Sequence, residues 1–477
     1  MLWIALGLKL GVEPVRWSHF GGMISFLGAV YGTWRLASLI FRESLAALLA
    51  VLLLIANYTF LAYATGGLET MLQAALVCLA MLQLHRIARR KAGIARPFLL
   101  SSLLAAAVLT RMDSALPAAI IGIAALVFLY REPANWKSYL ALALPFAVLV
   151  GSWFIWKATY YGRILPNSYY AKVSGGAGLA NGLVYLWRFF HWYLLWPFLL
   201  LGALVLLVRR RETNRRLMLL LIVILVWCGY VIWVGGDFME FRFLVPIAPF
   251  LFVLLAYLVY YQIGRVLIRR PAAVSLVTLG ALLAVSVFHA RSFVGVTADR
   301  TLDSISSLAD FYGVYPDHDW RKIGETMKSA FKGVPAVLAT SAVGAIPYYS
   351  DLRTVDMLGL NDRYVAEHGV RSDASYRRPG HLRHAPLSYL QQQKVNFVIG
   401  HPSLVSPGFL ENPDISSLLS DWIQTRDVGP DRVTEMTAVI LPLDARQGLL
   451  LWYFTPTEEI DSLIRARHWE ARTVSVR

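Results

Sequence analysis

Charged and aromatic side chains gather in four short segments that interrupt long apolar runs: Gly66–Glu69, Arg111–Asp113, Lys157–Lys172 and Gly235–Arg242. Ionisable groups are costly at membrane depth, so in such surroundings they indicate a functional site. Carboxylates can take a proton from a hydroxyl group, and arginine or lysine can hold a phosphate. The four segments therefore predict a site for a phosphate-bearing substrate at a membrane surface.

The two shortest segments each allow a structural and a functional interpretation. Glu69 follows two glycines at the start of an apolar run, where a carboxylate either caps a helix or contacts a substrate. Arg111 and Asp113 join two apolar runs. They either pair with each other or leave the guanidinium to grip a phosphate with two hydrogen bonds.

The segment Gly235–Arg242 reads GGDFMEFR and offers a base and a phosphate clamp within a few residues. Its two glycines allow the backbone to approach a ligand closely, and Asp237 and Arg242 supply opposite charges. The alternative is a plain loop with an internal salt bridge. We favour the site, because these charges lie at the edge of the membrane.

The segment Lys157–Lys172 reads KATYYGRILPNSYYAK, and we expect a long loop of the kind that often forms a lid. Its tyrosines can stack on a sugar and donate hydrogen bonds, while Lys172 can neutralise a phosphate. The alternative is an aromatic anchor in the membrane interface, which explains the tyrosines but explains Asn167 and the cations less well.

Other kinds of chemistry find no support in the sequence. His381 and His384 lack the context of a metal-binding motif, and we expect neither a metal nor a cofactor. No P-loop, GxSxG, CxxC or dinucleotide fingerprint occurs, which argues against nucleotide-driven pumps and Rossmann enzymes. Cys78 and Cys228 lie in apolar runs and act most simply as small apolar side chains.

The composition predicts that a polytopic membrane domain positions these segments. Of 477 residues, 57% are hydrophobic and only 16% charged, against about 25% charged in a typical soluble domain. Ten apolar stretches are long enough, or nearly so, to cross the hydrocarbon core of a bilayer. They lie near residues 19–40, 45–63, 67–86, 97–110, 114–130, 138–157, 183–207, 216–234, 243–263 and 272–290.

The distribution of cations sets the expected orientation. Residues 1–290 hold 25 Lys and Arg against 8 Asp and Glu, and 17 of these 25 cations fall in alternate connections. The positive-inside rule makes those connections cytoplasmic. The four charged segments, a short helix over Leu2–Val12 and everything after about Ala290 are then expected outside. The same rule explains the net charge of +15, so nucleic-acid binding is not expected.

We divide the chain into a transmembrane domain, residues 1–290, and an extracytoplasmic α/β domain, residues 291–477. In the second domain, short β-rich runs alternate with helical patterns. The expected strands are Val334–Ala339, Arg353–Met357, Asn396–Gly400, Thr437–Leu443 and Leu449–Phe454, and the expected helices are Asp319–Phe331 and Pro386–Gln393.

Several motifs occur in a fixed order: GGLE, a TR-x-D element, YYG-x-x-LPNSYYAK, GGDFME-x-RF, and the runs IPYYSDLRTVDMLGLND and GHxxHAP. Together, from about Leu2 to about Gly400, they resemble GT-C fold integral-membrane glycosyltransferases, most closely the terminal arabinofuranosyltransferase group. The resemblance implies an enzyme of the cytoplasmic membrane, with about ten transmembrane helices, that uses a polyprenyl-phosphate sugar and no nucleotide sugar. It implies transfer of arabinofuranose or a related pentose to a cell-envelope glycan or glycoprotein.

The resemblance also suggests roles for the charged segments. Asp237 and Asp113 are the carboxylates expected to take part in catalysis. The donor phosphate is assigned to Arg111, Lys172 and Arg242. The sugar or acceptor is assigned to Glu69, Tyr161, Asn167, Tyr169 and Tyr170.

Two features depart from the family pattern. Met112 stands where a proline is usual between the arginine and the acidic residue. The family also begins with a transmembrane helix and an acidic loop that carries the expected base, and we expect both to precede Met1. Two rival functions stay open: a transporter or lipid-linked sugar flippase, whose inverted repeats we do not find, and a truncated, catalytically inactive binding subunit.

The orientation can be tested with reporter fusions placed after Arg300. We expect activity from an exported reporter such as alkaline phosphatase, because the cation-rich connections alternate with the tail. A reporter that works only in the cytoplasm should be silent at this position. The opposite pattern would put all four charged segments on the wrong face of the membrane.

Overall fold

The computed structural model describes residues 2–89, 93–131, 135–172, 178–208, 212–293, 302–309, 319–371, 383–411, 415 and 435–475. The chain forms two compact units, which are described separately. The first comprises Met1–Ile164 and Gly178–Ala298, and the second comprises Leu165–Ala177 and Asp299–Arg477. The segment Leu165–Ala177 therefore groups with the second unit although its neighbours in the chain are helices of the first.

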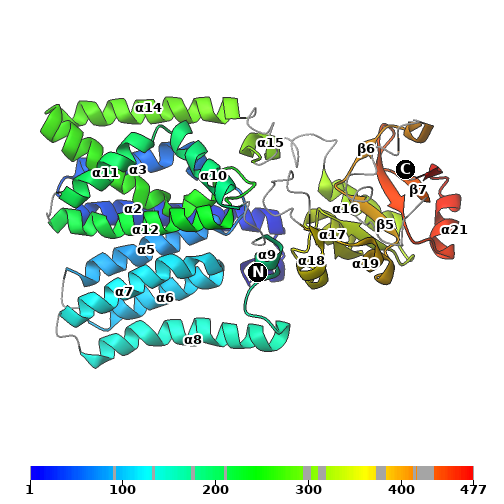
Figure 1. Cartoon of the computed structure of the whole chain (residues 1–477), viewed down its shortest axis with the longest axis horizontal. Helices are drawn as coiled ribbons and strands as arrows, with labels where there is room; N and C mark the ends of the chain where they lie inside the picture. Colours follow the sequence, from blue (N-terminus) through cyan, green and yellow to red (C-terminus); the bar gives the residue numbers. More distant parts are fainter. Residues whose placement is uncertain are drawn as a thin grey trace. The chain divides into compact units, whose positions relative to one another are not determined.

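The first unit is a bundle of apolar helices (Figure 1). In chain order it contains α1 (Leu2–Lys9), α2 (Pro14–Ile40), α3 (Ser44–Ala56), α4 (Tyr58–Ala62), α5 (Thr70–Ile87), α6 (Ala95–Thr110), η1 (Met112–Ser114), α7 (Ala115–Arg131), α8 (Trp136–Tyr161), α10 (Gly178–Trp192), α11 (Trp196–Val208), α12 (Glu212–Val234), η2 (Arg242–Ile247), α13 (Ala248–Tyr257), η3 (Leu258–Leu267) and α14 (Pro271–Ser292). Among the described residues, seven helical segments are long and apolar enough to span a membrane, and α3 and α6 are shorter apolar helices. The predicted polytopic helical class is confirmed.

The bundle surrounds one segment, Arg242–Leu267, which comprises η2, α13 and η3 and is buried from residue 244 to residue 260. By contrast, α8 and α14 lie at opposite edges of the bundle and expose many apolar side chains (Figure 1). Helices are suited to this environment because they satisfy their own backbone hydrogen bonds in lipid. Arg242, at the start of the central segment, has a side chain that is 13% exposed.

Two predicted elements are wrong in detail. The expected single helix over 183–207 is two helices, because the chain turns at Leu194, which has a φ of 53°, just before the Trp196-Pro197 start of α11. The expected long loop from Lys157 is also shorter, since α8 continues to Tyr161 and ends at Gly162 in the left-handed conformation. Lys157 is therefore a helical residue rather than part of a lid.

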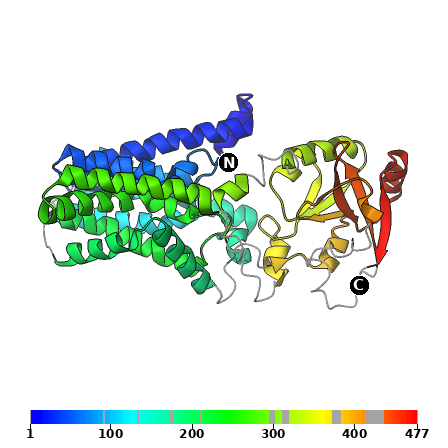
Figure 2. The ribbon, with the colours of Figure 1, turned by 90° about the horizontal axis from the view of Figure 1, so that it is seen from above.

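The second unit is built on a seven-stranded mixed sheet (Figure 2). Its strands are β1 (Val337–Thr340), β2 (Arg353–Asp356), β5 (Phe397–Gly400), β6 (Leu404–Val405), β7 (Glu435–Pro442), β8 (Gly448–Tyr453) and β9 (Ala471–Ser475), and β3 (Val370–Arg371) and β4 (Arg383–His384) form a separate pair. The order is β2-β1-β5-β8-β7-β9, with β6 also paired to β8. β1 is parallel to both β2 and β5, and the other pairings are antiparallel. The five predicted strands all occur.

Helices cover both faces of this sheet, which confirms the predicted α/β class. The described α-helices of the second unit are α9 (Asn167–Lys172), α15 (Ile305–Ala309), α16 (Trp320–Ala330), α17 (Ala345–Ser350), α18 (Arg363–His368), α19 (Leu387–Gln392) and α21 (Glu458–Ala466). One apolar core contains residues of α18 and α19, and the other contains residues of α16 and α21. Alternate residues of β1, Leu338 and Ala339, enter opposite cores, as the two-residue period of a strand requires.

Asp356 organises the turn that follows β2, and replacing it tests the second unit. Its Oδ1 accepts a hydrogen bond from the Leu358 N–H at 2.8 Å, and its Oδ2 accepts one from the Asn361 N–H at 2.6 Å. We expect Asp356→Asn to lower the free energy of unfolding of this unit by about 1–3 kcal/mol, because one buried N–H loses its acceptor. The exposed Asp351→Asn variant is the control and should have almost no effect. Protease cleavage within residues 319–475 of the full chain, measured against temperature, provides the readout, and equal midpoints for the two variants would contradict the expectation.

Candidate functional site

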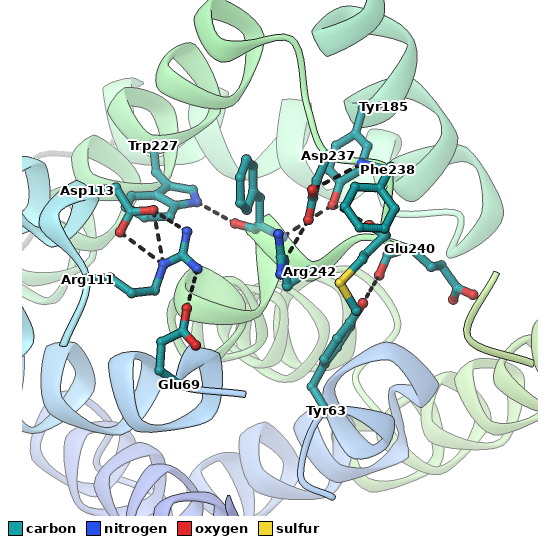
Figure 3. A network of polar contacts seen from close by, with 12 residues as sticks. Tyr63, Glu69, Arg111, Asp113, Tyr185, Trp227, Asp237, Phe238, Glu240 and Arg242 are labelled. Atoms are coloured by element: carbon teal, nitrogen blue, oxygen red, sulfur yellow. Dashed lines mark hydrogen bonds and ion pairs between the residues drawn. The ribbon is translucent and has the colours of Figure 1, made fainter. Parts of the chain in front are cut away.

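Arg111 lies at the centre of one group of charges in the first unit (Figure 3). Its Nη1 lies 2.8 Å from Glu69 Oε1, and its Nη2 lies 2.7 Å from Asp113 Oδ2. Its Nε donates to both Asp113 oxygens at 3.2 Å. Gln73 also donates to Asp113 Oδ1, at 2.8 Å. The guanidinium is therefore shared between two carboxylates.

Helix ends bring these groups together. α6 ends at Thr110, Arg111 is extended with a φ of −147°, and a short 3-10 turn begins at Met112. Glu69 stands at the N-cap position of α5, yet its side chain makes no capping hydrogen bond. Its carboxylate is directed to Arg111 instead, and Arg111 and Asp113 pair with each other as one interpretation of the sequence allowed.

A second group of charges lies in the loop between α12 and η2. Asp237 Oδ2 lies 2.6 Å from Arg242 Nε, and the two side chains are only 2% and 13% exposed. Asp237 Oδ1 accepts a hydrogen bond from the Phe238 N–H at 3.0 Å. The internal salt bridge considered from the sequence is thus present, in a buried loop.

Neighbouring helices hold the shape of this loop. Gly235 and Gly236 have φ values of 86° and 74°, a region that favours glycine. A Cβ at Gly236 would lie 2.9 Å from the Tyr185 side chain of α10. The Tyr185 hydroxyl accepts from the Phe243 N–H at 3.2 Å, and the Trp227 indole of α12 donates to the Phe243 carbonyl at 2.6 Å. Close packing of the loop accounts for the two glycines.

The two groups form one cluster around Phe243. The Arg111 and Arg242 guanidinium carbons lie 5.5 and 5.6 Å from the centre of the Phe243 ring. The structure therefore brings five predicted site residues together: Glu69, Arg111, Asp113, Asp237 and Arg242. Its three carboxylates and two arginines give this cluster a formal net charge of −1.

Glu240 and His289 form a buried pair that the sequence reasoning did not single out. Glu240 Oε1 lies 2.7 Å from His289 Nε2, and both side chains are almost fully buried. The imidazole stacks between Tyr193 and Phe293, with ring centres 4.9 and 4.5 Å away. The pair fixes the Gly235–Arg242 loop to α14. A histidine within a predicted membrane span was the available signal, because polar groups there are rarely incidental.

Lys157 is a second residue that the sequence reasoning did not assign. It lies near the end of α8 and is only 8% exposed. Its Nζ lies 3.6 Å from Met112 Sδ and 4.9 Å from the centre of the Trp153 ring. Met112 is the residue between Arg111 and Asp113 in the chain. Its placement in an expected loop concealed this burial.

The remaining predicted residues are not part of this cluster as described. Tyr161 ends α8 in the first unit, is exposed, and packs edge-on against Tyr160 and Trp156. Asn167, Tyr169 and Tyr170 belong to α9 in the second unit, where α9 packs against α18. The side chain of Lys172 and the whole of His381 lie outside the described residues.

Metal ligands do not gather in the described part of the chain. No group of three or more His, Cys, Asp or Glu residues within it could hold a metal ion. His384 is buried in β4 of the second unit. The expectation that the protein needs no metal or cofactor stays a prediction.

Comparison with solved structures relates this architecture to known proteins. The crystal structure of ArnT from Cupriavidus metallidurans bound to undecaprenyl phosphate is similar with a TM-score of 0.54 and 14% identity, covering 94% of this chain and 86% of that chain. The crystal structure of the same protein in the apo state is similar with a TM-score of 0.53 and 13% identity, and it covers the same fractions of the two chains. The crystal structure of an oligosaccharyltransferase from Archaeoglobus fulgidus, in complex with zinc and sulfate, has a TM-score of 0.44 and 12% identity. The match covers 93% of this chain and 63% of that chain. The likeness to ArnT confirms the GT-C fold of a multi-pass membrane protein.

Sequence comparison adds one match. A family model described as a domain of unknown function (DUF8728) matches residues 313–445, within the second unit. No curated protein sequence matches the chain.

The packing of the charged loop can be tested at Gly236. We expect Gly236→Ala to destabilise the protein by about 1–2 kcal/mol or more, because alanine disfavours the left-handed conformation and its Cβ would press on Tyr185. Gly229→Ala in α12 is the matched control, since nothing lies within 4 Å of the added Cβ. Thermal unfolding in detergent measures both variants. Equal stability would mean that the loop does not depend on its glycine.

Proposed function

We propose that this protein is a GT-C type glycosyltransferase that moves a sugar from a polyprenyl-phosphate donor to a cell-envelope glycan or glycoprotein. The observation that carries this proposal is the cluster of arginines and carboxylates around Phe243 in a fold similar to that of ArnT. ArnT has been crystallised with undecaprenyl phosphate. Arabinofuranose or a related pentose is the sugar we propose, following the resemblance of the sequence motifs.

The proposed reaction is a direct displacement at the anomeric carbon. The acceptor oxygen bonds to this carbon, the bond to the donor phosphate breaks, and its electron pair stays on the phosphate. A carboxylate takes the proton of the acceptor hydroxyl. The site must therefore supply a base on one side of the sugar and positive charge for the leaving phosphate on the other.

Arg242 suits the phosphate role best among the two clustered arginines. Its Nε pairs with Asp237, and neither terminal nitrogen donates a hydrogen bond to any described residue. A guanidinium oriented in this way by one carboxylate can present its terminal nitrogens to a phosphate as a fork. Arg111, by contrast, uses Nε and both terminal nitrogens on Glu69 and Asp113.

Glu69 is the carboxylate that we propose as the base among the residues of the cluster. Its side chain is 45% exposed, against 6% for Asp113 and 2% for Asp237. Only its Oε1 contacts Arg111, so Oε2 faces no donor among the described residues. For Asp113 and Asp237, which the sequence suggested as catalytic carboxylates, the pairing supports a positioning role.

The wider setting of the reaction stays part of the proposal. We place the protein in the cytoplasmic membrane, with the cluster and the second unit on the outer side. The bilayer, the lipid-linked donor and the glycan or glycoprotein acceptor are its partners, without nucleic acid or a cofactor. Tyr161, Asn167, Tyr169, Tyr170 and Lys172 are proposed to contact the sugar, the acceptor or the donor phosphate.

Arg242 provides the test of the phosphate assignment. Arg242→Ala should lower kcat/KM by roughly 30- to 5,000-fold, corresponding to the loss of about 2–5 kcal/mol for a desolvated charged contact. Arg242→Lys keeps the charge but loses the fork and should fall in between. The assay measures sugar transfer from a polyprenyl-phosphate pentose to an envelope glycan.

The matched control is Arg265→Ala, which removes an arginine from an exposed salt bridge with Glu43. It should change kcat/KM by less than about twofold, because exposed pairs contribute little. Wild-type turnover by Arg242→Ala would remove this residue from the site. No transfer by the unaltered protein, together with movement of an unchanged lipid-linked sugar across vesicles, would replace the transferase by a flippase.

A further inference from the structure

Lys157 is a buried cation without an anionic partner in the described part of the chain. It is 8% exposed, and no carboxylate there lies within salt-bridge distance of its Nζ. Its two contacts are the Met112 sulfur, at 3.6 Å, and the face of Trp153, at 4.9 Å. A thioether is a weak acceptor, and an aromatic face replaces only part of the hydration that a buried ammonium loses.

The position of Lys157 does not fit a lysine that reaches out of the membrane to water. Lysines near helix ends often extend their stems so that the charge stays hydrated. In the last two turns of α8, Trp156, Tyr160 and Tyr161 are exposed, whereas Lys157 points to Met112. The ammonium is therefore directed into the protein, towards the segment that carries Arg111 and Asp113.

The neighbouring cluster has more carboxylates than arginines, so a further cation beside it would offset this excess of negative charge. Arg111 and Arg242 are outnumbered by Glu69, Asp113 and Asp237, which gives a net charge of −1. A phosphate that approaches the cluster alone meets more carboxylates than arginines. Lys157 adds a positive charge beside Met112, and no carboxylate of the described residues pairs with it.

We propose that Lys157 is a further cation, beside Arg242, that binds the phosphate of a lipid-linked phosphate ester, an inference that rests on the proposed function. When the bond between the anomeric carbon and the phosphate oxygen breaks, its electron pair stays on the phosphate. The charge of the phosphate then rises from about −1 in the diester to about −2 in the monoester. Lys157 supplies charge for this change together with the terminal nitrogens of Arg242, while Arg111 remains paired with Glu69 and Asp113.

Ligand-dependent unfolding of Lys157→Met tests this proposal. We expect the unfolding temperature of the unaltered protein in detergent to rise with polyprenyl phosphate. Lys157→Met should unfold at the same or a higher temperature without ligand, because it removes an unpaired buried charge. It should bind polyprenyl phosphate at least 10-fold more weakly. Lys157→Arg should retain most of the affinity, since it keeps the charge.

Lys137→Met is the matched control, because Lys137 is an exposed lysine near the other end of the same helix. It should leave the affinity for polyprenyl phosphate unchanged. If Lys157→Met does not fold, Lys157→Gln carries the same measurement with a polar, uncharged tip. Unchanged affinity for polyprenyl phosphate in the neutral variant that folds would overturn the proposal in favour of a structural role.

Two further ligands separate the possible sources of the phosphate. Vesicles of phosphatidylglycerol and inorganic phosphate should produce no shift that depends on Lys157, and an equal shift with either would overturn the assignment to a lipid-linked substrate. The experiments also distinguish a failure of this proposal from a failure of the proposed function. Lys157-dependent binding without sugar transfer would overturn the transferase alone, whereas transfer at the wild-type rate by Lys157→Met would overturn the role of Lys157 alone.

Discussion

The pairing of buried charges is the constraint on which the charged end of the helical unit depends. Arg111 is held by Glu69 from α5 and by Asp113 from the turn before α7, so one guanidinium joins the ends of three helices. Removing Asp113, whose side chain is only 6% exposed, would leave the charge of Arg111 only partly compensated, which is more costly than the pair is favourable. Phe243 links this arrangement to Arg242, since both guanidinium groups lie beside its ring.

The loop that carries Asp237 and Arg242 is fixed from the opposite side by Glu240. Its carboxylate reaches His289 on α14, an edge helix of the bundle, and aromatic rings enclose the imidazole. The Tyr63 hydroxyl donates to the Glu240 carbonyl at 2.8 Å, which adds a contact from the region just after α4. This loop between two helices is thereby held by contacts with several neighbouring helices. These contacts fix the position of Asp237, which can then orient Arg242.

Much of the fold could be predicted because its signals are local. Apolar runs bounded by cations gave the helices, and short β-rich runs gave five of the seven strands of the main sheet, including β2 over Arg353–Asp356. The two strands that were missed are β6 and β9. The errors arose where a turn interrupts an apolar run or a helix outlasts it. Leu194 adopts a left-handed turn inside a continuous hydrophobic stretch, and α8 extends through the polar and aromatic residues up to Tyr161. At neither position does the amino-acid composition of the sequence mark where the helix ends.

The charged cluster was predictable in its members but not in its partnerships. Asp237 and Arg242 are close in the chain, so their salt bridge was one of two interpretations. Glu69 lies 42 residues from Arg111, and only the packing of helix ends brings them together. That partnership matters for chemistry, because a guanidinium engaged by two carboxylates has few donors left for a ligand. The role of an arginine in such a cluster therefore follows from its unused hydrogen-bond donors rather than from its charge, and the same reasoning gives the greatest weight to cations, such as Lys157, that no described carboxylate neutralises.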